Sequence, residues 1–477
     1  MSALSRSAAG VAGPAPVGIV HLGLGAFFRA HQAAYTEAAN TEAAGIGAAG
    51  IGAANTGAGG GPGGERTGIA AFTGRRPDAA LPLAAQDGLY HLLVRDAGGD
   101  RTELVTSISG AYDGADVATW CRHLADPGLS CVTLTVTEAG YRRGADGGPD
   151  LDDPDTRADL DLLRRGEPAT ATTAPGRLLQ GLAARRAADA GPLAIVPCDN
   201  LVDNGTAVQT VVTRLAIEVD PGLADWVAAS VSFVSTTIDR ITPATTPDDV
   251  EVVAKLTGYA DAAPVVTEPF SEWVLAGDFP AGRPAWELAG ARFVADVRPF
   301  EDRKLWLLNG AHSLLAYAAP SRGHATVAAA IDDPVCRSWV ETWWDEAARH
   351  LRLPADDIAR YRADLLERFA NPRIRHALSQ IAMDGSQKLP IRVLPVLTRE
   401  RESGVLPEAG VLALAGWLAH LREGTSVRDA RADYLRGLVA GDLPNATARM
   451  LHFLSPALAD DAELLDAVTA AARELGS

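Results

Sequence analysis

The chain has 477 residues, of which 47% are hydrophobic and 22% are charged, and its formal net charge is −17. This length exceeds one hydrophobic core of ordinary size, so at least two domains of ordinary globular composition are predicted. The acidic balance excludes a nucleic-acid polyanion as the main partner, because such sites need a surplus of Lys and Arg, and it favours a small-molecule partner.

Signals of export and membrane insertion are not found in the sequence. The four cysteines have neither C-x-x-C spacing nor the density of a disulfide scaffold. Residues 1–18 contain no apolar signal segment, and no run of about 18 apolar residues follows. We therefore expect a cytoplasmic protein without a membrane partner.

The first patterned stretch resembles the opening of a dinucleotide-binding domain. Residues 1–16 are small and unpatterned, and we expect a disordered lead-in. VGIVHLGLGAFFRAHQ then combines an apolar strand pattern, a Gly-x-Gly turn at Gly23 and Gly25, and a helical pattern. Phe28 replaces the third glycine of the fingerprint, so a turn without ligand is the alternative. Arg29 in the first helical turn favours an anion there.

The next segment leaves the coenzyme open. Residues 39–66 are rich in Gly and Ala with a near-duplication, which predicts a flexible surface insertion. A second strand is expected at 67–72, followed by Arg75, Arg76 and Asp78. An acidic residue in this region binds the ribose of NAD, whereas arginine suits the 2′-phosphate of NADP, so both coenzymes remain candidates.

Three later runs, 129–141, 191–205 and 231–244, are apolar, β-rich and end in polar residues. Buried parallel strands have this pattern, and ligands gather at their carboxyl ends. The candidate site residues at these ends are Thr137, Glu138, Asp199, Asn200, Asp239 and Arg240.

Long amphipathic helical patterns dominate after about residue 290. The predicted fold is therefore α/β, with a Rossmann-type dinucleotide-binding domain at 17–289 and a mostly α-helical domain at 290–477. Residues 301–317 are expected at the junction, where small-molecule clefts often form.

The segment 301–317, EDRKLWLLNGAHSLLAY, carries polar side chains on an apolar helical face. At about 100° per residue, Lys304, Asn309 and His312 share an arc with leucines. A lysine among leucines has a lowered pKa and can act as a base. The alternative is a lysine that reaches water from the helix start, with the histidine as a satisfied core group.

Seven motifs, in order along the chain, make the sequence resemble the mannitol dehydrogenase family of polyol dehydrogenases, which includes the fructuronate reductases. The motifs are GLGAFFRAHQ (23–32), LTVTEAGY (134–141), CDNLVDNG (198–205), IDRITPATTP (238–247), EPFSEWV (268–274), KLWLLNGAHS (304–313) and DGSQKLP (384–390). The resemblance implies NAD-dependent, metal-independent interconversion of a secondary alcohol and a ketone on a linear sugar derivative. The sequence also has no His/Cys cluster with zinc-ligand spacing.

The resemblance also implies roles for individual residues. Lys304 would be the catalytic acid/base, with Asn200 and Asn309 beside the reacting oxygen. His312 would orient a substrate hydroxyl or the lysine, and Glu301 would lie on a proton path. The implied substrate contacts are Asp239, Lys388, Gln380 and Met383. The implied cofactor contacts are Gly23, Gly25, Phe27, Arg29, Thr137, Glu138 and Asp78.

One departure from the family pattern bears on the substrate. Mannitol-oxidising members carry Arg and His just before D-G-S, whereas this chain has Gln380 and Met383, as the fructuronate reductases do. This favours D-mannonate and D-fructuronate, with Lys388 as a cation for the carboxylate. Mannitol or mannitol-1-phosphate oxidation are the alternatives, and a non-catalytic dinucleotide sensor would not need Lys304 with two asparagines. A monomer or small homo-oligomer is expected.

Overall fold

The computed structural model describes residues 1–48, 66–74, 76–374, 376–423 and 427–476. They form two compact units, Met1–Val297 and Arg298–Ser477. The first is an α/β unit and the second is mostly α-helical, which confirms the predicted fold class. The division lies a few residues after the expected boundary at residue 290.

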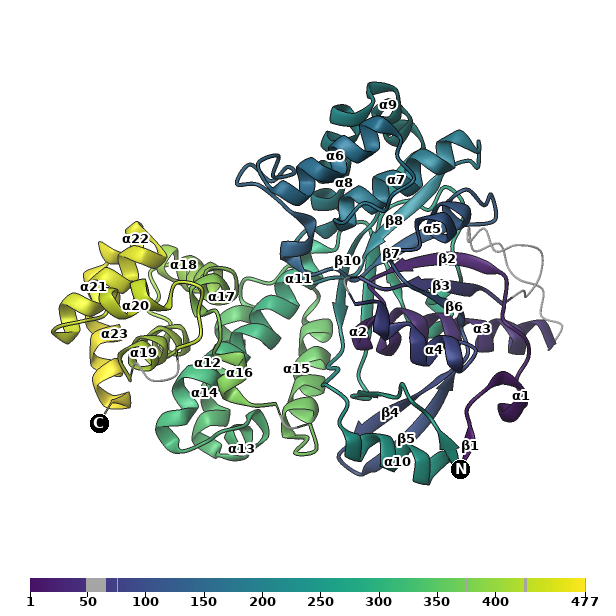
Figure 1. The fold of residues 1–477 in the computed structure, drawn as a ribbon. Helices are drawn as coiled ribbons and strands as arrows, with labels where there is room; N and C mark the ends of the chain where they lie inside the picture. Colours follow the sequence, from purple (N-terminus) through teal and green to yellow (C-terminus); the bar gives the residue numbers. More distant parts are fainter. Residues whose placement is uncertain (49–65, 75, 375, 424–426, 477) are drawn as a thin grey trace. The chain divides into compact units, whose positions relative to one another are not determined.

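A six-stranded parallel sheet forms the centre of the N-terminal unit (Figure 1). Its strands are β2 (Val17–Leu22), β3 (Gly68–Phe72), β6 (Ile108–Tyr112), β7 (Cys131–Leu134), β8 (Leu193–Pro197) and β9 (Val231–Phe233). The order across the sheet is β6-β3-β2-β7-β8-β9. Counted along the chain, these are the third, second, first, fourth, fifth and sixth strands. This is the order of dinucleotide-binding folds, in which ligands bind where the order reverses, here between β2 and β7.

Helices cover both faces of this sheet (Figure 1). Ile19 packs with Phe28 in one apolar cluster, whereas the adjacent Val20 packs with Trp120 in another. Successive strand residues therefore enter opposite cores, which explains the near-continuous apolar strand sequences. The helices of this unit include α2 (Ala26–Ala30), α3 (Gln32–Ala48), α4 (Leu81–Ala85), α5 (Val117–Leu124), α6 (Pro154–Arg165), α7 (Ala174–Ala187), α8 (Asn204–Val219), α9 (Pro221–Ser230) and α10 (Pro247–Thr257).

The run 231–244, expected to be one buried parallel strand, is divided between two sheets. β9 ends the parallel sheet, and the backbone N–H of Val234 still donates to Ile195 O at 2.9 Å. β10 (Ser235–Asp239) then pairs antiparallel with β13 (Glu272–Ala276), beside β14 (Arg292–Phe293). The expectation was wrong because the β-branched run continues unbroken through the change of sheet.

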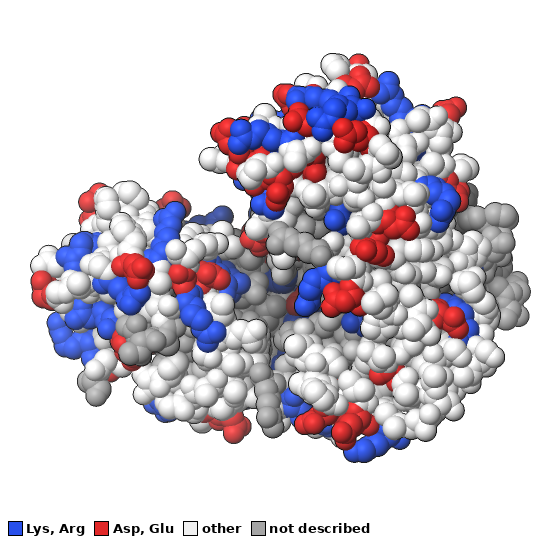
Figure 2. Space-filling model, viewed as in Figure 1, with Lys and Arg blue, Asp and Glu red and all other residues white. Residues whose placement is uncertain are grey.

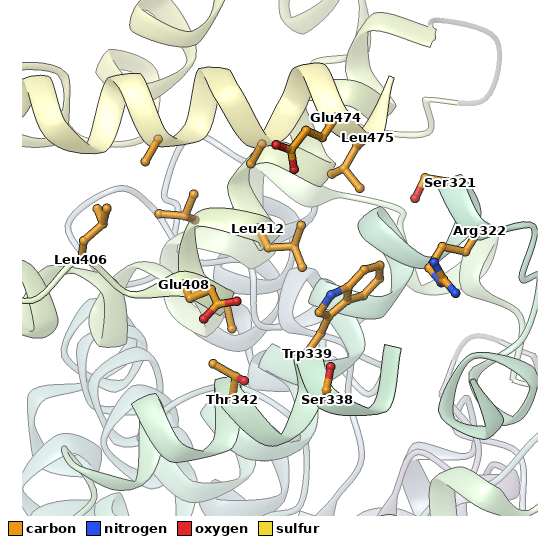
Figure 3. A pocket seen from close by; sticks show the side chains of 14 residues that line it. Ser321, Arg322, Ser338, Trp339, Thr342, Leu406, Glu408, Leu412, Glu474 and Leu475 are labelled. Atoms are coloured by element: carbon orange, nitrogen blue, oxygen red, sulfur yellow. The ribbon is translucent and has the colours of Figure 1, made fainter. Parts of the chain in front are cut away.

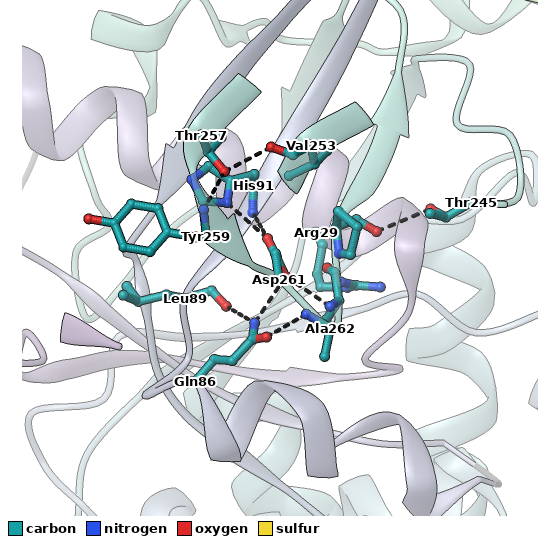
Figure 4. Close-up of polar contacts among 12 residues, drawn as sticks. Arg29, Gln86, Leu89, His91, Thr245, Val253, Thr257, Tyr259, Asp261 and Ala262 are labelled. Carbon is teal, nitrogen blue, oxygen red and sulfur yellow. Dashed lines mark hydrogen bonds and ion pairs between the residues drawn. The ribbon is translucent and has the colours of Figure 1, made fainter. Parts of the chain in front are cut away.

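A buried carboxylate organises the third sheet of this unit, β12 (Val265–Thr267), β4 (Tyr90–Asp96) and β5 (Gly99–Val105). Asp261 follows β11 (Tyr259–Ala260) and accepts bonds from the His91 backbone N–H at 2.7 Å and from Gln86 Nε2 at 3.0 Å (Figure 4). Burial would raise the pKa of Asp261, but the hydrogen bonds outweigh burial and lower the pKa. The network thus ties the start of β4 to the segment before β12.

Residues 1–16 are structured, contrary to the expected disordered lead-in. β1 (Ser2–Ala3) pairs with β11, and α1 (Arg6–Ala9) follows. Leu4 is 1% exposed. The Arg6 guanidinium donates to Thr106 O at 2.7 Å and Ile108 O at 3.0 Å. Small-residue composition could not reveal this anchor, because the carbonyls that Arg6 satisfies lie about a hundred positions away.

The expected insertion 39–66 is helical in its first part. α3 continues to Ala48, and residues 49–65 lie outside the described residues, as does Arg75. Asn40 on α3 donates to Thr67 O at 2.9 Å and accepts from Thr67 N at 2.8 Å. This two-way bond fixes α3 to the residue that precedes β3.

The C-terminal unit packs helices around α12, every residue of which is buried. Its helices include α11 (Arg298–Arg303), α12 (Ala311–Ala318), α13 (Val327–Asp332), α14 (Pro334–Ala348), α15 (Ala355–Ala370), α16 (Leu378–Ile381), α17 (Gly385–Arg392), α18 (Leu394–Glu402), α19 (Glu408–Glu423), α20 (Ala432–Leu438), α21 (Leu443–Leu454), α22 (Pro456–Ala459) and α23 (Ala462–Leu475). Among the described parts of both units, no helix has the length and apolarity needed to span a bilayer. Acidic and basic side chains are interspersed over the face in Figure 2, as on an ordinary solvated surface.

Glu346 on α14 caps the buried start of α19, and this gives a pH-dependent prediction. Its carboxylate accepts from Ala409 N at 2.8 Å and Gly410 N at 3.0 Å. Burial raises the pKa of Glu346 to about 7. The folded protein therefore holds a proton that the unfolded chain releases at lower pH, so this contribution to stability is lost as pH rises through about 7.

We expect Glu346→Gln to remove that pH dependence. The difference in unfolding free energy between wild type and variant should fall by up to roughly 3 kcal/mol between pH 4.5 and pH 8. Denaturant unfolding across this range measures it. Glu402→Gln, the same change at an exposed position of α18, is the control. Parallel curves for wild type and Glu346→Gln would contradict the prediction.

Candidate active site

The turn after β2 requires glycine at position 23. Gly23 has φ +113°, and a Cβ there would lie 2.3 Å from Thr135 O. Its N–H donates to Phe72 O at 2.9 Å, and its carbonyl accepts from Thr135 Oγ1 at 2.8 Å. The turn is thus fixed between the ends of β3 and β7, at the point where the strand order reverses.

A buried histidine that the sequence reasoning missed supports this turn. The His21 ring nitrogens lie 2.8 Å from Thr133 Oγ1 and 3.1 Å from Thr135 Oγ1. The ring stacks on Phe28, with centroids 3.5 Å apart and planes 10° apart. Burial lowers the pKa of His21 to about 3, so the imidazole is neutral at physiological pH. Phe28, at the place of the third glycine, therefore has a packing role. The available signal was a lone histidine within an apolar strand.

Gly25 is explained less well by the protein's own packing. Its φ is −142°, which other residues adopt, and a Cβ would meet only Gly23 O at 3.5 Å, an ordinary contact. The fold itself does not require glycine at this position. A glycine of this kind is expected where a ligand approaches the backbone closely, because it has no side chain in the way. The fold therefore requires glycine at position 23, whereas Gly25 leaves the backbone of the turn open to the approach of a dinucleotide.

Arg29 has a structural role that corrects the argument for an anion beside it. Its guanidinium donates to the carbonyls of Ala263 and Gly25 and lies over the Tyr90 ring, 5.3 Å from the centroid. These backbone acceptors explain a cation in the first turn of α2 without a bound phosphate. Phe27, half-buried, stacks on His31 at 5.5 Å.

The other predicted cofactor residues are at the surface of the N-terminal unit. Thr137 and Glu138 are exposed where β7 gives way to a 3₁₀ turn, Glu138–Tyr141. Asp78 is exposed in another 3₁₀ turn after β3, and Arg76 beside it is exposed too. The residues that would favour NAD and NADP are therefore equally accessible.

Asn200 follows β8, and Asp239 ends β10, a strand of another sheet in the same unit. Asn200 is exposed in the loop between β8 and α8, directly after the half-buried Asp199. Asp239 is the buried last residue of β10. The Arg240 guanidinium donates to Ala30 O at 2.6 Å and Glu268 O at 3.1 Å, so it has backbone acceptors of its own.

In the C-terminal unit, Lys304–Gly310 forms a π-helix between α11 and α12, which corrects the α-helical wheel used above. In a π-helix the N–H of residue i+5 bonds to the carbonyl of residue i. Lys304 and Asn309 therefore lie one π-turn apart on the same side, whereas five positions of an α-helix would separate them by about 140°. Both side chains are half-buried. Short π-helical segments are frequent at functional sites.

Two tryptophans of α14 hold this π-helical segment. Trp343 Nε1 donates to Trp306 O at 2.7 Å, and Trp344 Nε1 donates to Leu307 O at 2.9 Å. A Cβ on Gly310 would lie 2.6 Å from the Trp343 ring, so the close approach of the indole depends on glycine. Carbonyls displaced from α-helical pairing thus receive side-chain donors.

His312 and Glu301 belong to the same continuous helix. His312 is 5% exposed, stacks on Phe369 at 4.7 Å and meets His376 edge-on at 4.8 Å. Glu301 is 6% exposed and precedes Lys304 by three positions on α11. Aromatic packing therefore fixes the imidazole ring of His312, two positions after the π-helix.

The segment with the predicted substrate residues packs on the π-helix through α17. Lys388 is half-buried and its Nζ donates to Ile381 O at 3.2 Å. Burial, and then the charge of Arg392, lower the pKa of Lys388, while Asp384 and Asp429 oppose the shift. Lys388 on α17 is thus influenced by one cation and two carboxylates. Gln380 is exposed on α16, and Met383 is half-buried just before α17.

Other features of the C-terminal unit lie outside this set of residues. A cavity of about 690 Å³ is lined by residues including Trp339, Leu412 and Leu475 of α14, α19 and α23 (Figure 3), and no predicted site residue lines it. Elsewhere, ligand atoms of His324, Asp333 and Cys336 lie within 4.8 Å of one another. Asp333 Oδ2 also accepts from Arg322 Nε at 2.7 Å, and its Oδ1 caps α14. This cluster is a satisfied ion pair at a helix start.

Comparisons with known proteins agree with this two-part architecture. Residues 17–288 match the sequence model of the mannitol dehydrogenase Rossmann domain, and residues 296–475 match that of the mannitol dehydrogenase C-terminal domain. The chain is 35% identical over 456 residues to the uncharacterized oxidoreductase YeiQ of Escherichia coli (strain K12), covering 93% of this chain and 88% of that protein. It is 34% identical over 471 residues to D-mannonate oxidoreductase of the same organism, covering 96% and 93%.

A solved structure shows the same likeness over the whole chain. The ternary complex of Pseudomonas fluorescens mannitol 2-dehydrogenase with NAD and D-mannitol is 30% identical, with a TM-score of 0.78. The match covers 100% of this chain and 97% of that chain.

The two glycines of the turn should respond differently to substitution. Gly25→Ala should keep the thermal midpoint within a few degrees and weaken NADH binding by about tenfold or more, because its methyl group obstructs only the ligand. Gly23→Ala should destabilise the fold itself, because its Cβ would meet Thr135 O. Thermal unfolding and NADH fluorescence titration measure the pair. Unchanged NADH affinity in Gly25→Ala would refute the assignment.

Proposed function

Because the chain belongs to the mannitol dehydrogenase family of oxidoreductases, we propose that it transfers hydride between NAD and a secondary alcohol on a linear sugar derivative. The observation that carries this proposal is the π-helical register that brings Lys304 and Asn309 one turn apart in the C-terminal unit. A base and an amide donor on one side of a helix can serve the same hydroxyl group.

The proposed chemistry divides among three polar groups. Lys304 takes the hydroxyl proton of the alcohol and returns it when the ketone is reduced. The amides of Asn309 and Asn200 donate to the oxygen as its negative charge develops. When bound, the nicotinamide accepts or supplies the hydride. The glycine turn at Gly23 and Gly25 is the proposed seat of its pyrophosphate.

His312 and Glu301 support Lys304 in this proposal. The His312 ring is fixed by Phe369 and His376, so it can orient a substrate hydroxyl or the lysine amine. Glu301 lies in the preceding helical turn, where a carboxylate can exchange the proton that Lys304 takes.

The proposed substrate pair is D-mannonate and D-fructuronate. Lys388 and Arg392 lie close enough for the charge of Arg392 to lower the pKa of Lys388. A carboxylate bound between them would relieve this repulsion, and charge-assisted bonds are the stronger kind. Asp239, Gln380 and Met383 are proposed to contact the rest of the substrate. The similarity to D-mannonate oxidoreductase also supports this choice.

Mannitol and fructose are the second candidate pair. The likeness to the mannitol 2-dehydrogenase complex with D-mannitol favours them, and a neutral polyol needs only hydroxyl partners. NADP is the second candidate coenzyme, with Arg76 to bind a 2′-phosphate.

Replacement of Lys304 tests the proposed base. We expect Lys304→Ala to lower kcat by about 10²-fold or more while the dissociation constant of NADH stays within about twofold, because only proton transfer is removed. Stopped-flow hydride transfer and NADH fluorescence separate the two effects. Hydride transfer at wild-type speed in the variant would exclude Lys304 as the base.

A substrate panel tests the proposed carboxylate. Fructuronate should be reduced with a higher kcat/KM than fructose. Lys388→Met should lower kcat/KM for fructuronate by about tenfold or more and for fructose much less, because a charge-assisted bond is lost only with the uronate. Lys255→Met, at an exposed position of α10, is the matched control. Efficient turnover of mannitol and fructose with no action on the uronate would favour the second candidate.

A further inference from the structure

The loop that carries Asn200 has an internal anchor that the chemistry above does not use. We propose that the hydrogen-bonded pair Tyr141–Asp199 is a positioning device that fixes the amide of Asn200 for the reaction. This inference rests on the proposed function, in which Asn200 donates to the reacting oxygen. Tyr141 and Asp199 are positioning residues, since they act through Asn200.

The two carboxylate oxygens of Asp199 reach both sides of the loop. Oδ2 accepts a short bond from the Tyr141 hydroxyl. Oδ1 accepts from Leu201 N at 3.1 Å, which closes a turn of the backbone around Asn200. The residue before Asn200 is thus bonded to the residue after it and to the 3₁₀ turn that follows β7. A rotation of the Asn200 peptide units would break one of these bonds.

The far end of the loop has contacts of its own with the backbone of β8 and β10. Asn204 Oδ1 accepts from Thr236 N at 2.9 Å, and its Nδ2 donates to Pro197 O at 3.2 Å. A Cβ on Gly205 would lie 2.6 Å from Ser235 N, so α8 begins against β10. Because its end is already held by backbone contacts, the loop does not need the Tyr141–Asp199 bond merely to stay closed.

Tyr141 and Asp199 lie where the removal of polar groups from water costs free energy. Tyr141 is 1% exposed, and burial raises the pKa of Asp199 to about 6. Asp199 faces Tyr141 and Glu138 from the 3₁₀ turn and Asn204 from its own loop. Apolar side chains could fill such a site at lower cost. An exposed amide beside a half-buried, doubly bonded carboxylate is the arrangement of a supported donor.

A double-mutant cycle tests the proposal. Tyr141→Phe, which removes only the hydroxyl, should lower kcat by about tenfold, with substrate KM within about threefold and NADH affinity within about twofold. In an Asn200→Ala background the same change should alter kcat by less than about twofold, because the group that it positions is gone. Tyr259→Phe, whose hydroxyl bonds to Ala8 O at 3.0 Å, is the control and should keep wild-type kcat.

A second variant, Asp199→Asn, tests the proposal if Tyr141→Phe does not fold. Asp199→Asn keeps the shape of the side chain but replaces the charged acceptor of these hydrogen bonds by a neutral amide. It should lose about threefold or more in kcat only when Asn200 is present. Equal losses of kcat in both backgrounds, or full kcat in Tyr141→Phe, would overturn the positioning role. If Lys304→Ala is inactive while Tyr141→Phe is fully active, the proposed function stands and this inference fails. Wild-type protein that turns over neither polyol nor uronate would overturn both.

Discussion

Two indole hydrogen bonds hold the polar helix of the C-terminal unit in an uncommon geometry. Trp343 and Trp344 donate to consecutive carbonyls of the π-helical segment, and Gly310 leaves the room that the first indole needs. A π-helix is rare, and the two indole donors stabilise this one. The register of Lys304 and Asn309 therefore depends on α14, whose own residues need not touch a substrate.

The sequence predicted this pair of residues but not its geometry. An α-helical wheel placed Lys304 and Asn309 on one broad arc with leucines, and the π-helix brings them closer than that wheel allowed. The reason is physical: the backbone register depends on Trp343 and Trp344, more than thirty positions away, and no local periodicity records such a contact. The residue types are visible in the sequence, whereas the backbone register is set by tertiary packing.

The same division explains the N-terminal unit. Parallel strands were predictable because both faces are buried, and apolar runs such as 193–197 show this directly. The change of sheet after Phe233 could not be predicted, because it depends on pairing with the distant strand β13. The structure of residues 1–16 could not be predicted either, because Arg6 donates to carbonyls about a hundred positions away. The argument for an anion beside Arg29 depends on contacts of the same kind. Arginine beside a glycine turn favours an anion only if its donors are unused, and here backbone carbonyls accept from them.

The glycine turn and the π-helical segment share one kind of support. Gly23 is bonded by Thr135, which contacts the neutral, buried His21. Asn309 is followed directly by Gly310, which packs on Trp343. In each case a solvent-accessible residue lies beside a buried residue, and the hydrogen bonds or packing of the buried residue restrain the local backbone. The buried neighbour already restrains the solvent-accessible group in the folded protein. The accessible group therefore loses less conformational entropy when a ligand binds. The signal for His21 in the sequence was its place between Val20 and Leu22 in an apolar strand, because a polar ring there must find partners on neighbouring strands.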